Sequence, residues 1–545
     1  MWGSNLTPQL RLLKTNLSAF QLSIPRAEIE TSATFKEAIR VTRCLGYRYL
    51  WIDSLCILQD SETDWEYEAR RMAIVYGNAV CNLAFLFPPH SNNNCRARDD
   101  PRKWNPCILR SVTEGGCPGV YIEHIGSLFR QEFGHEEKTR PWLVQRDWPL
   151  FDRAWTFQEY LLSPRTLLLG HQNLMFQCSQ LFHDELLGSL PDMQPTSNET
   201  PKRGKDRGKS RYFPPTIREL RSASSLSEPA VLSFMADWQN VINEYRSRRL
   251  SFAKDRVVAF AGIARAFANI GDLTYLAGAY KEIFPVCLLW YVDKKSPVRV
   301  RLENSLPQGV PLGDIWTSAI TEPIEHAAPS WSWFSVPIYR YYQLHFLLGD
   351  DELFVRCKSY KNPELVCFND IFWADLSSFQ FESHPPEHVL ESAFFEFTSL
   401  RVTLATLVLP VRENWPADLT AQMGILRTTS TSELDRDFNW DPVFTYYPDI
   451  PLGRKTPKQN AIYAVLAEFQ VVRTAGKNNI QRRLAGLVLI PGPHAGTWTR
   501  VGVWKLRINV SNVAVESKNM AHVAERWRGL EMLSPKWVFA LITIV

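Results

Sequence analysis

One acidic residue stands out because it interrupts an apolar stripe. Glu159 lies in the segment RAWTFQEYLL (153–162), whose apolar residues recur at helical spacing. Its neighbours along one helix face are Trp155 at i−4 and Leu162 at i+3. A desolvated carboxylate in this position has a raised pKa or a strong cationic partner, and such groups are enriched at functional sites. Beside a ribose it would stabilise the oxocarbenium-like transition state of glycosidic cleavage.

A structural role for Glu159 is the alternative. Arg153 and Arg165 flank the same helical segment. An ion pair between Glu159 and either guanidinium would clamp the helix without any chemistry. The residue types leave both roles open.

Asp53 is the second candidate. It directly follows the run YRYLWI (47–52), which is aromatic and β-branched and therefore predicts a strand. Open α/β sheets bind ligands at the carboxyl ends of their strands, where Asp53 would lie. It would hold a ribose hydroxyl there, or accept backbone N–H groups at the turn. We expect the nearby Trp51, Trp65 and Tyr76 to lie in the core.

The cysteines do not predict a metal centre. None of the ten falls in a Cys-x-x-Cys pair. The closest set has spacings too wide for a zinc module and comprises Cys95, Cys107 and Cys117 with His124 and His135. We expect reduced structural thiols and no metal site.

Two helices and two strands should carry the first candidates. Thr34 precedes Glu37 by three residues, which is a capping-box spacing, and Gly46 should end that helix. Thr63 and Glu66 repeat the spacing at the start of a second helix. VCNLAFLF (80–87) then predicts a buried strand, which we expect to pair in parallel with 47–52.

The helix of Glu159 has its own boundary signals. Asp152 is placed as its N-cap, and Pro164 lies beyond its end. The segment TLLLGHQNLMFQC (166–178) predicts two strands around a polar turn.

Four regions follow from the composition along the chain. We expect an α/β domain over 1–185, a basic disordered linker over 190–225, a helical connector over 230–335 and a β-rich domain over 336–545. Strands of the last region are expected at 400–411, 462–472, 501–510 and 537–545.

The bulk composition is that of an ordinary globular protein. Hydrophobic residues make up 45% of the 545 residues, and the net charge is only +4. We expect no signal peptide, since no basic segment followed by an apolar one is visible at the start, and no run of about 18 apolar residues and no nucleic-acid-binding motif are recognised. We expect a soluble cytoplasmic protein without a nucleic-acid or membrane partner.

Three blocks carry a family resemblance. LGYRYLWIDSLCILQD (45–60), DWEYEARRMAIVYGNA (64–79) and RAWTFQEYLLSPR (153–165) resemble, in order, the signature blocks of the fungal heterokaryon-incompatibility (HET) domain. Residues 245–264 and 328–333 resemble segments that often follow that domain.

The chain departs from the family pattern at two places. HET domains typically begin with a strand that leads into a Trp-Gly pair, whereas this chain starts at Met1-Trp2-Gly3, so the first strand is expected to be missing. Gln177 precedes Cys178, where the family usually has an acidic residue.

The resemblance implies a fold and a chemistry. HET domains are thought to be distant relatives of the Toll/interleukin-1-receptor (TIR) domain, a flavodoxin-like parallel-sheet fold in which some members cleave NAD with a helical glutamate. Trp155 to Glu159 is similar to the TIR pattern Trp-Cys-x-x-Glu. It implies that Glu159 and Asp53 are catalytic, that Arg153 and Trp155 bind NAD as substrate, and that no cofactor is needed.

The resemblance also implies a biological role in non-self recognition and cell-death signalling. The alternative to NAD cleavage is a non-enzymatic scaffold. It would bind other incompatibility or death-signalling proteins, or associate with itself.

Overall fold

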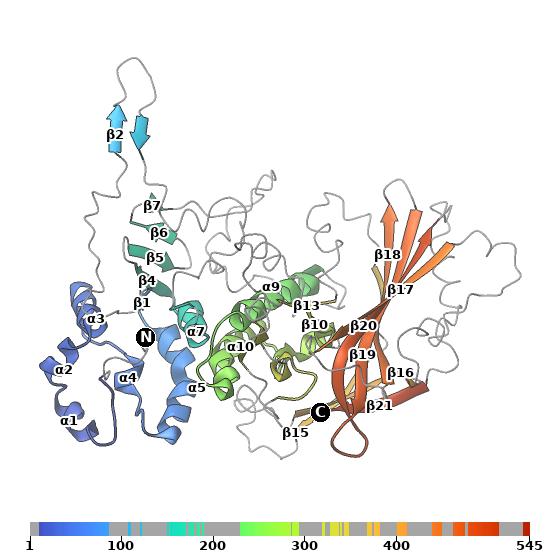
Figure 1. Cartoon of the computed structure of the whole chain (residues 1–545), viewed down its shortest axis with the longest axis horizontal. Coiled ribbons are helices and arrows are strands. Elements are labelled where there is room, and N and C mark those ends of the chain that lie inside the picture. The colour runs from blue at the N-terminus through green and yellow to red at the C-terminus, as the bar shows by residue number, and fades with distance from the viewer. Residues whose placement is uncertain are drawn as a thin grey trace, which may run out of the picture. The chain divides into compact units, whose positions relative to one another are not determined.

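The computed structural model describes the chain in segments, listed here by number: 10–86, 107–110, 120–122, 150–151, 153–170, 174–178, 182–185, 188–189, 229–284, 286–293, 319–321, 328–336, 338–339, 343–347, 368–372, 375–381, 400–410, 439–449, 462–474, 478–511 and 538–545. The chain divides into two compact units (Figure 1). The first contains Met1–Pro214, Arg248–Leu250 and Val258–Ala266; the second contains Pro215–Ser247, Ser251–Val257 and Phe267–Val545.

The first unit combines helices with a small sheet. Its helices are α1 (Leu17–Leu22), α2 (Arg26–Glu30), α3 (Ala33–Cys44), α4 (Asp53–Cys56), α5 (Glu62–Asn78) and α7 (Trp155–Leu162), joined by the first part of α10 (Val258–Gly271). The α5 and α7 helices pack against each other. The helices predicted near 34–45, 63–79 and 153–162 are confirmed as elements.

The caps of these helices differ from the predicted ones. Ser32, not Thr34, begins α3, and its hydroxyl accepts the Phe35 N–H at 3.3 Å. Ser61, not Thr63, precedes α5. Gly46 takes a left-handed φ of 79° directly after the C-cap of α3, as predicted for a glycine in that position. Asp152 lies outside the described residues.

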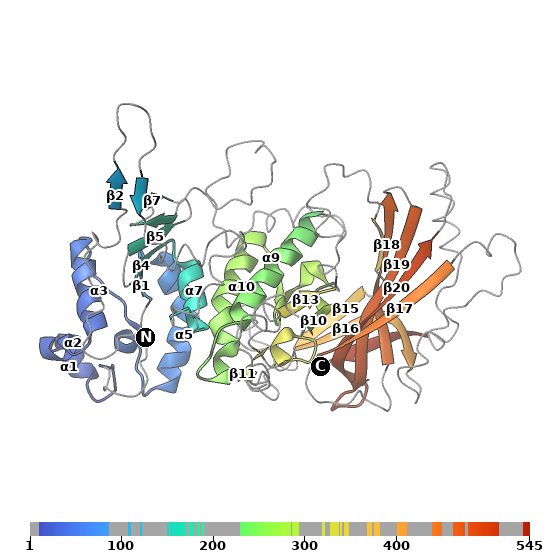
Figure 2. The ribbon, with the colours of Figure 1, turned by 45° about the horizontal axis from the view of Figure 1, so that its top comes forward.

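The sheet of the first unit is mixed. It runs in the order β1 (Asn82–Phe85), β4 (Arg165–Leu169), β5 (Leu174–Cys178), β6 (Phe182–Asp184) and β7 (Gly188–Ser189) (Figure 1, and turned in Figure 2). Only β1 and β4 pair in parallel among these strands, and the predicted hairpin over 166–178 is confirmed as β4 and β5.

The predicted pairing of 47–52 with 80–87 is wrong, because 47–52 forms no strand. The aromatic side chains of this run do not pack in a sheet. Tyr49 is 88% exposed and Tyr47 is 45% exposed, so these rings are not buried in a sheet. The described residues of this unit form a mixed α/β fold, and the flavodoxin-like arrangement stays a prediction.

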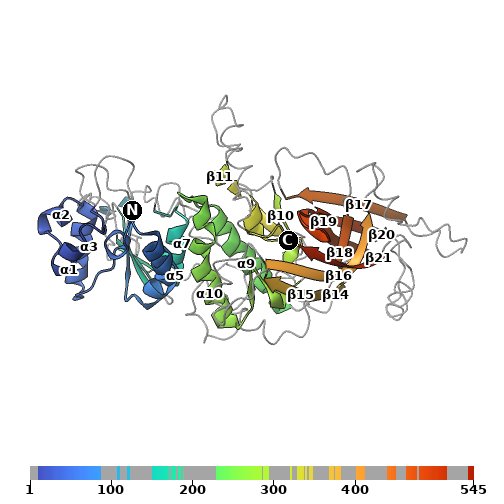
Figure 3. The same cartoon turned by 90° about the horizontal axis from the view of Figure 1, so that it is seen from below.

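α10 lies beside α7 (Figure 3), and a glycine in α10 allows a close approach to α7 and α5. A Cβ built at Gly262 would lie 2.6 Å from Gln158 Oε1 on α7 and 2.7 Å from the Ala73 Cβ on α5. Real Cβ atoms do not make contacts this short, so the packing of α10 here requires glycine.

The second unit begins with helices and ends in long strands. Its helices are α9 (Pro229–Arg246), the 3₁₀ turn η4 (Ala253–Arg256) and the end of α10, followed by the 3₁₀ turns η5 (Lys281–Ile283), η6 (Val286–Leu288) and η7 (Trp333–Ser335). Short pairs form between β8 (Tyr275–Leu276) and β9 (Ala279–Tyr280), β10 (Trp290–Asp293) and β13 (Gln343–Phe346), and β11 (Ala319–Thr321) and β12 (Ile338–Tyr339).

The large sheet contains eight strands. They are β14 (Phe368–Phe372), β15 (Asp375–Phe381), β16 (Leu400–Pro410), β17 (Asn439–Pro448), β18 (Ile462–Thr474), β19 (Asn478–Pro491), β20 (Thr497–Ser511) and β21 (Val538–Ile544). The strands predicted at 400–411, 462–472, 501–510 and 537–545 are confirmed as β16, β18, β20 and β21. The predicted linker at 190–225 lies outside the described residues, and the predicted domain boundaries stay predictions. None of the described helices is long and apolar enough to cross a membrane.

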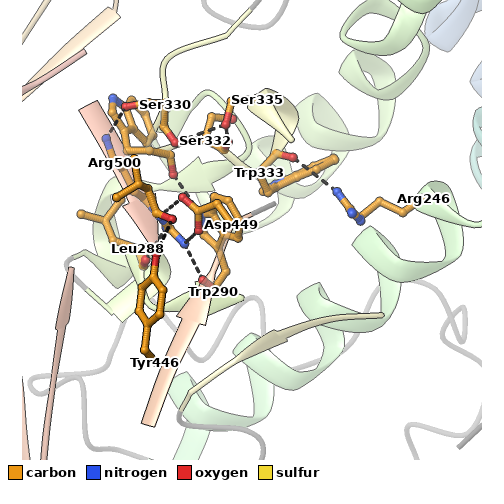
Figure 4. Close-up of polar contacts among 12 residues, drawn as sticks. Arg246, Leu288, Trp290, Ser330, Ser332, Trp333, Ser335, Tyr446, Asp449 and Arg500 are labelled. Atoms are coloured by element: carbon orange, nitrogen blue, oxygen red, sulfur yellow. Dashed lines mark hydrogen bonds and ion pairs between the residues drawn. The ribbon is translucent and has the colours of Figure 1, made fainter. Parts of the chain in front are cut away.

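A buried ion pair lies between β20 and the residue that follows β17, and its guanidinium also contacts η6 and β10 (Figure 4). Arg500 on β20 contacts Asp449 through Nε at 3.0 Å and Nη2 at 2.8 Å. The same guanidinium donates to the carbonyls of Leu288 at 2.7 Å and Trp290 at 2.5 Å, and lies 3.5 Å from the Trp290 ring centroid. A buried guanidinium with this many partners holds the elements that it contacts together.

The close approach of α10 gives a stability prediction. Gly262→Ala should lower the free energy of unfolding by about 1–3 kcal/mol, because the added methyl group overpacks the contact with Gln158 and Ala73. The matched control is Gly77→Ala on α5, whose new Cβ would meet nothing closer than the Leu162 carbonyl oxygen at 4.0 Å. That variant should gain about 0.5–1 kcal/mol from helix propensity. Chemical denaturation of both variants measures the difference; equal stabilities would refute the close packing.

Candidate active site

A cleft of about 500 Å³ lies in the first unit beside the helix that carries Glu159. Its walls come from α3, the segment 45–54, the end of α5, β1 and residues 150–160. Its polar and charged lining includes Arg48, Asp53, Tyr76, Arg153 and Glu159. The volume falls within the range of small-molecule sites, about 300–1,000 Å³.

The cleft brings together three of the four residues singled out in the sequence. Glu159, Asp53 and Arg153 all line it. Trp155 is not among its described lining residues and packs edge-on against Trp65, with ring centroids 6.1 Å apart. The predicted ligand-binding role of Trp155 therefore has no support in this arrangement.

Glu159 has an unusual electrostatic setting. Burial is the largest effect on its carboxyl group and raises its pKa, and the nearby Asp53 carboxylate raises it further. The positive charge of Arg153 and the nearby Tyr76 hydroxyl act in the opposite direction, and the net result is a raised pKa. When ionised, this carboxylate is poorly hydrated. It would therefore interact strongly with a positive charge that develops beside it.

The backbone of Glu159 is fixed independently of its side chain. Its carbonyl accepts hydrogen bonds from Ser163 Oγ at 2.5 Å and from Asn82 Nδ2 on β1 at 3.3 Å. The helix and the adjacent strand thus locate the residue, and the carboxylate is left to the cleft.

The structural clamp expected as the alternative does not form within ion-pair distance. None of the ion pairs within 4 Å among the described residues joins Glu159 to Arg153. Arg165 is exposed and donates to the Val80 carbonyl at 3.4 Å. Arg153 acts on Glu159 through its charge across the cleft lining.

Asp53 begins the short helix α4, and its Oδ1 accepts the Ser54 N–H at 2.7 Å. Asp53 thus accepts a backbone N–H at the turn, which is one of its two expected roles. It also lines the cleft. The extended segment before α4, not a strand end, places Asp53 at the cleft.

Tyr76 was expected in the core, but it is half-buried and lines the cleft. Trp51 lies beside it, edge-on, with ring centroids 5.6 Å apart. Burial, together with the charges of Glu159 and Asp53, raises the pKa of the Tyr76 hydroxyl well above its usual range, so the hydroxyl stays a hydrogen-bond donor. The signal that could have predicted this position is the polar hydroxyl that Tyr76 carries at the end of an apolar helix face.

The chemistry of this lining suits a cationic or glycosidic transition state. Two carboxylate residues, a tyrosine and two arginines line the same cleft. Within the described segments, no group of three or more His, Cys, Asp or Glu residues could hold a metal ion.

One comparison with known proteins gives a match. Residues 1–159 match the family model described as heterokaryon incompatibility protein (HET). No curated protein and no solved structure matches the chain. The match covers the first two blocks identified in the sequence completely and the third block as far as Glu159. It indicates a HET domain in this part of the chain.

The raised pKa of Glu159 predicts how its replacement affects stability. A carboxyl group with a raised pKa in the folded state contributes stability that is present at low pH and lost as pH rises through that pKa. Glu159→Gln should therefore be more stable than wild type above this pKa, with the difference vanishing at lower pH. Chemical denaturation across a pH series measures it, with the exposed Glu66→Gln as a control that shows no such trend. A loss of stability at every pH would instead indicate a structural clamp.

Proposed function

We propose that the chain acts in heterokaryon incompatibility as a cytoplasmic protein, and that the cleft of its first unit cleaves NAD. The HET family match over residues 1–159 supports the first part. The observation that carries the second is the placement of the Glu159 carboxylate in one cleft with Asp53, Arg153 and Tyr76. A TIR-like chemistry would need this kind of lining.

The proposed reaction is a hydrolysis. The bond between the ribose C1′ and the nicotinamide nitrogen breaks, and its electron pair leaves with nicotinamide, which departs as a neutral molecule. Positive charge develops on the ribose and is stabilised by the Glu159 carboxylate. Water attacks C1′ and loses a proton, which gives ADP-ribose. No general acid is required for the leaving group.

The other lining residues take supporting roles in this proposal. Asp53 would hold a ribose hydroxyl, and Arg153 would bind the diphosphate. Trp51 lines the cleft and offers an aromatic edge or face to a base, in place of the role first assigned to Trp155.

A non-enzymatic scaffold is the second candidate function. Exposed apolar and aromatic side chains of the first unit favour it, among them Leu22 at 90% and Tyr49 at 88% exposure. Such side chains would bind another incompatibility or death-signalling protein or a second copy of the chain.

Replacement of the glutamate separates these functions. Nicotinamide release by the purified full chain should fall by at least about a hundredfold in Glu159→Gln, because the carboxylate stabilises the transition state. Glu66→Gln, an exposed charge on α5, should leave the rate unchanged. Since ionised Glu159 is required, the wild-type rate should fall as pH decreases through its raised pKa.

Two outcomes would contradict the proposal. Unchanged turnover in Glu159→Gln would show that another residue carries the chemistry. No nicotinamide release by folded wild-type protein would leave the scaffold as the better account.

A further inference from the structure

The helix that carries Glu159 is contacted by chain from well beyond the family match. Arg248–Leu250 and Val258–Ala266 both belong to the first unit, although they follow α9 in the sequence. We call these two segments the strap. The family match ends at residue 159, so the strap lies outside it.

Arg248 makes the most specific contacts of the strap. It is 1% exposed, and its Nη1 donates to Thr156 Oγ1 at 3.2 Å. Its guanidinium carbon lies 4.7 Å from the ring centroid of Phe157 and 5.7 Å from that of Phe151. A planar cation between ring faces and a hydroxyl is held in one orientation, and it holds its partners in turn.

Thr156 connects Arg248 to residues that line the cleft. Its hydroxyl oxygen lies 2.8 Å from the carbonyl oxygens of both Arg153 and Leu150, which share its one proton. Leu150, Arg153 and Thr156 line the same cleft as Glu159, which lies three residues further along α7. Arg248 thus adjoins a polar cluster at the first turn of this helix.

The backbone of the strap reinforces the same turn. The Ala154 N–H donates to the Arg249 carbonyl at 2.8 Å, and Ala154 is the N-cap of α7. Backbone donors at a helix start have no partner within the helix, so this bond anchors its beginning. Gly262 then seats α10 against Gln158 on the same helix.

We propose that Arg248 is a positioning residue for Glu159, fixing the first turn of α7 so that the carboxylate faces Asp53, Tyr76 and Arg153. The inference rests on the proposed function and extends it: the catalytic module is discontinuous and includes the strap. It also means that residues 1–189 by themselves lack part of the support of the site.

The residues on both sides of the strap are anchored elsewhere. Arg246 Nη1 donates to the Trp333 carbonyl at 3.4 Å (Figure 4). Arg256 Nη1 donates to the carbonyls of Phe334 at 3.0 Å and Val336 at 2.6 Å. These contacts lie within the second unit, whereas the contacts of the strap lie within the first.

The test follows the Glu159 carboxyl group directly. Full-chain protein with ¹³C-labelled glutamate is titrated by NMR, and the Glu159 signal is assigned by its absence in Glu159→Gln. The variant is Arg248→Met, which keeps an apolar stem and removes the guanidinium. The control is Arg249→Met, because this exposed residue is the neighbour of Arg248 and its substitution keeps the carbonyl that accepts the Ala154 N–H.

Loss of positioning and loss of charge move this titration in opposite directions. If α7 is released, Glu159 gains water, and its raised pKa should fall towards the ordinary value in Arg248→Met but not in Arg249→Met. An unchanged pKa would show that Arg248 serves only to stabilise the fold. A higher pKa would show that it acts as a nearby positive charge. Either result would overturn the proposal.

A kinetic readout and a conservative variant complete the test. In Arg248→Met the kcat for NAD should fall by about tenfold or more with a smaller change in KM, since orientation and not binding is lost. Arg248→Lys, which keeps the charge but not the planar fork, should show the same direction of pKa change with smaller size. If wild type releases no nicotinamide, the proposed function fails, while the titration still decides the positioning claim.

Discussion

The burial of one ionisable carboxylate is the constraint on which the site in the first unit depends. Glu159 loses hydration on the cleft side of α7, and its neighbour Asp53 adds an unfavourable like charge. Arg153 and the Tyr76 hydroxyl offset part of this penalty without removing it. A fold tolerates such a residue only where the surrounding structure holds it, and here β1, Ser163 and the strap fix the backbone of α7.

Buried charge in the second unit has a different character. The Arg500 guanidinium is matched by the Asp449 carboxylate, two backbone carbonyls and the Trp290 ring. Every contact there is internal, so the group fastens elements together. The comparison indicates why Glu159 is the better candidate for chemistry: its carboxylate lines a cleft and has a phenol and a distant cation as partners, with no close ion pair to a described residue.

Local patterns in the sequence predicted elements well and their partners poorly. The helical spacing of 153–162 and the long alternating runs near the C-terminus predicted the correct elements. A helix or strand that buries one face repeats its apolar residues at a fixed spacing, which can be recognised in the sequence. The run 47–52 failed because aromatic residues that line a cleft have the same composition as a buried strand. Ser32 displaced Thr34 as the cap since both satisfy the same chemical requirement.

The site was partly predictable for the same reason. Glu159 and Asp53 stood out by their immediate neighbours, whereas Tyr76, whose hydroxyl lowers the pKa of Glu159, looked like an ordinary core residue. Arg248 contacts Thr156 across 92 residues of sequence, and no local pattern in a single sequence encodes that contact. Long-range packing therefore decides which polar residues meet, and the sequence by itself indicates only which ones are available.

The most direct test of this account is the pKa of Glu159 in wild type, Tyr76→Phe and Asp53→Asn, measured by ¹³C NMR on the full chain. The account predicts a raised pKa in wild type. Loss of the Tyr76 hydroxyl should raise it further, and loss of the Asp53 charge should lower it. An ordinary pKa that neither substitution moves would contradict the claim that these groups share one cleft.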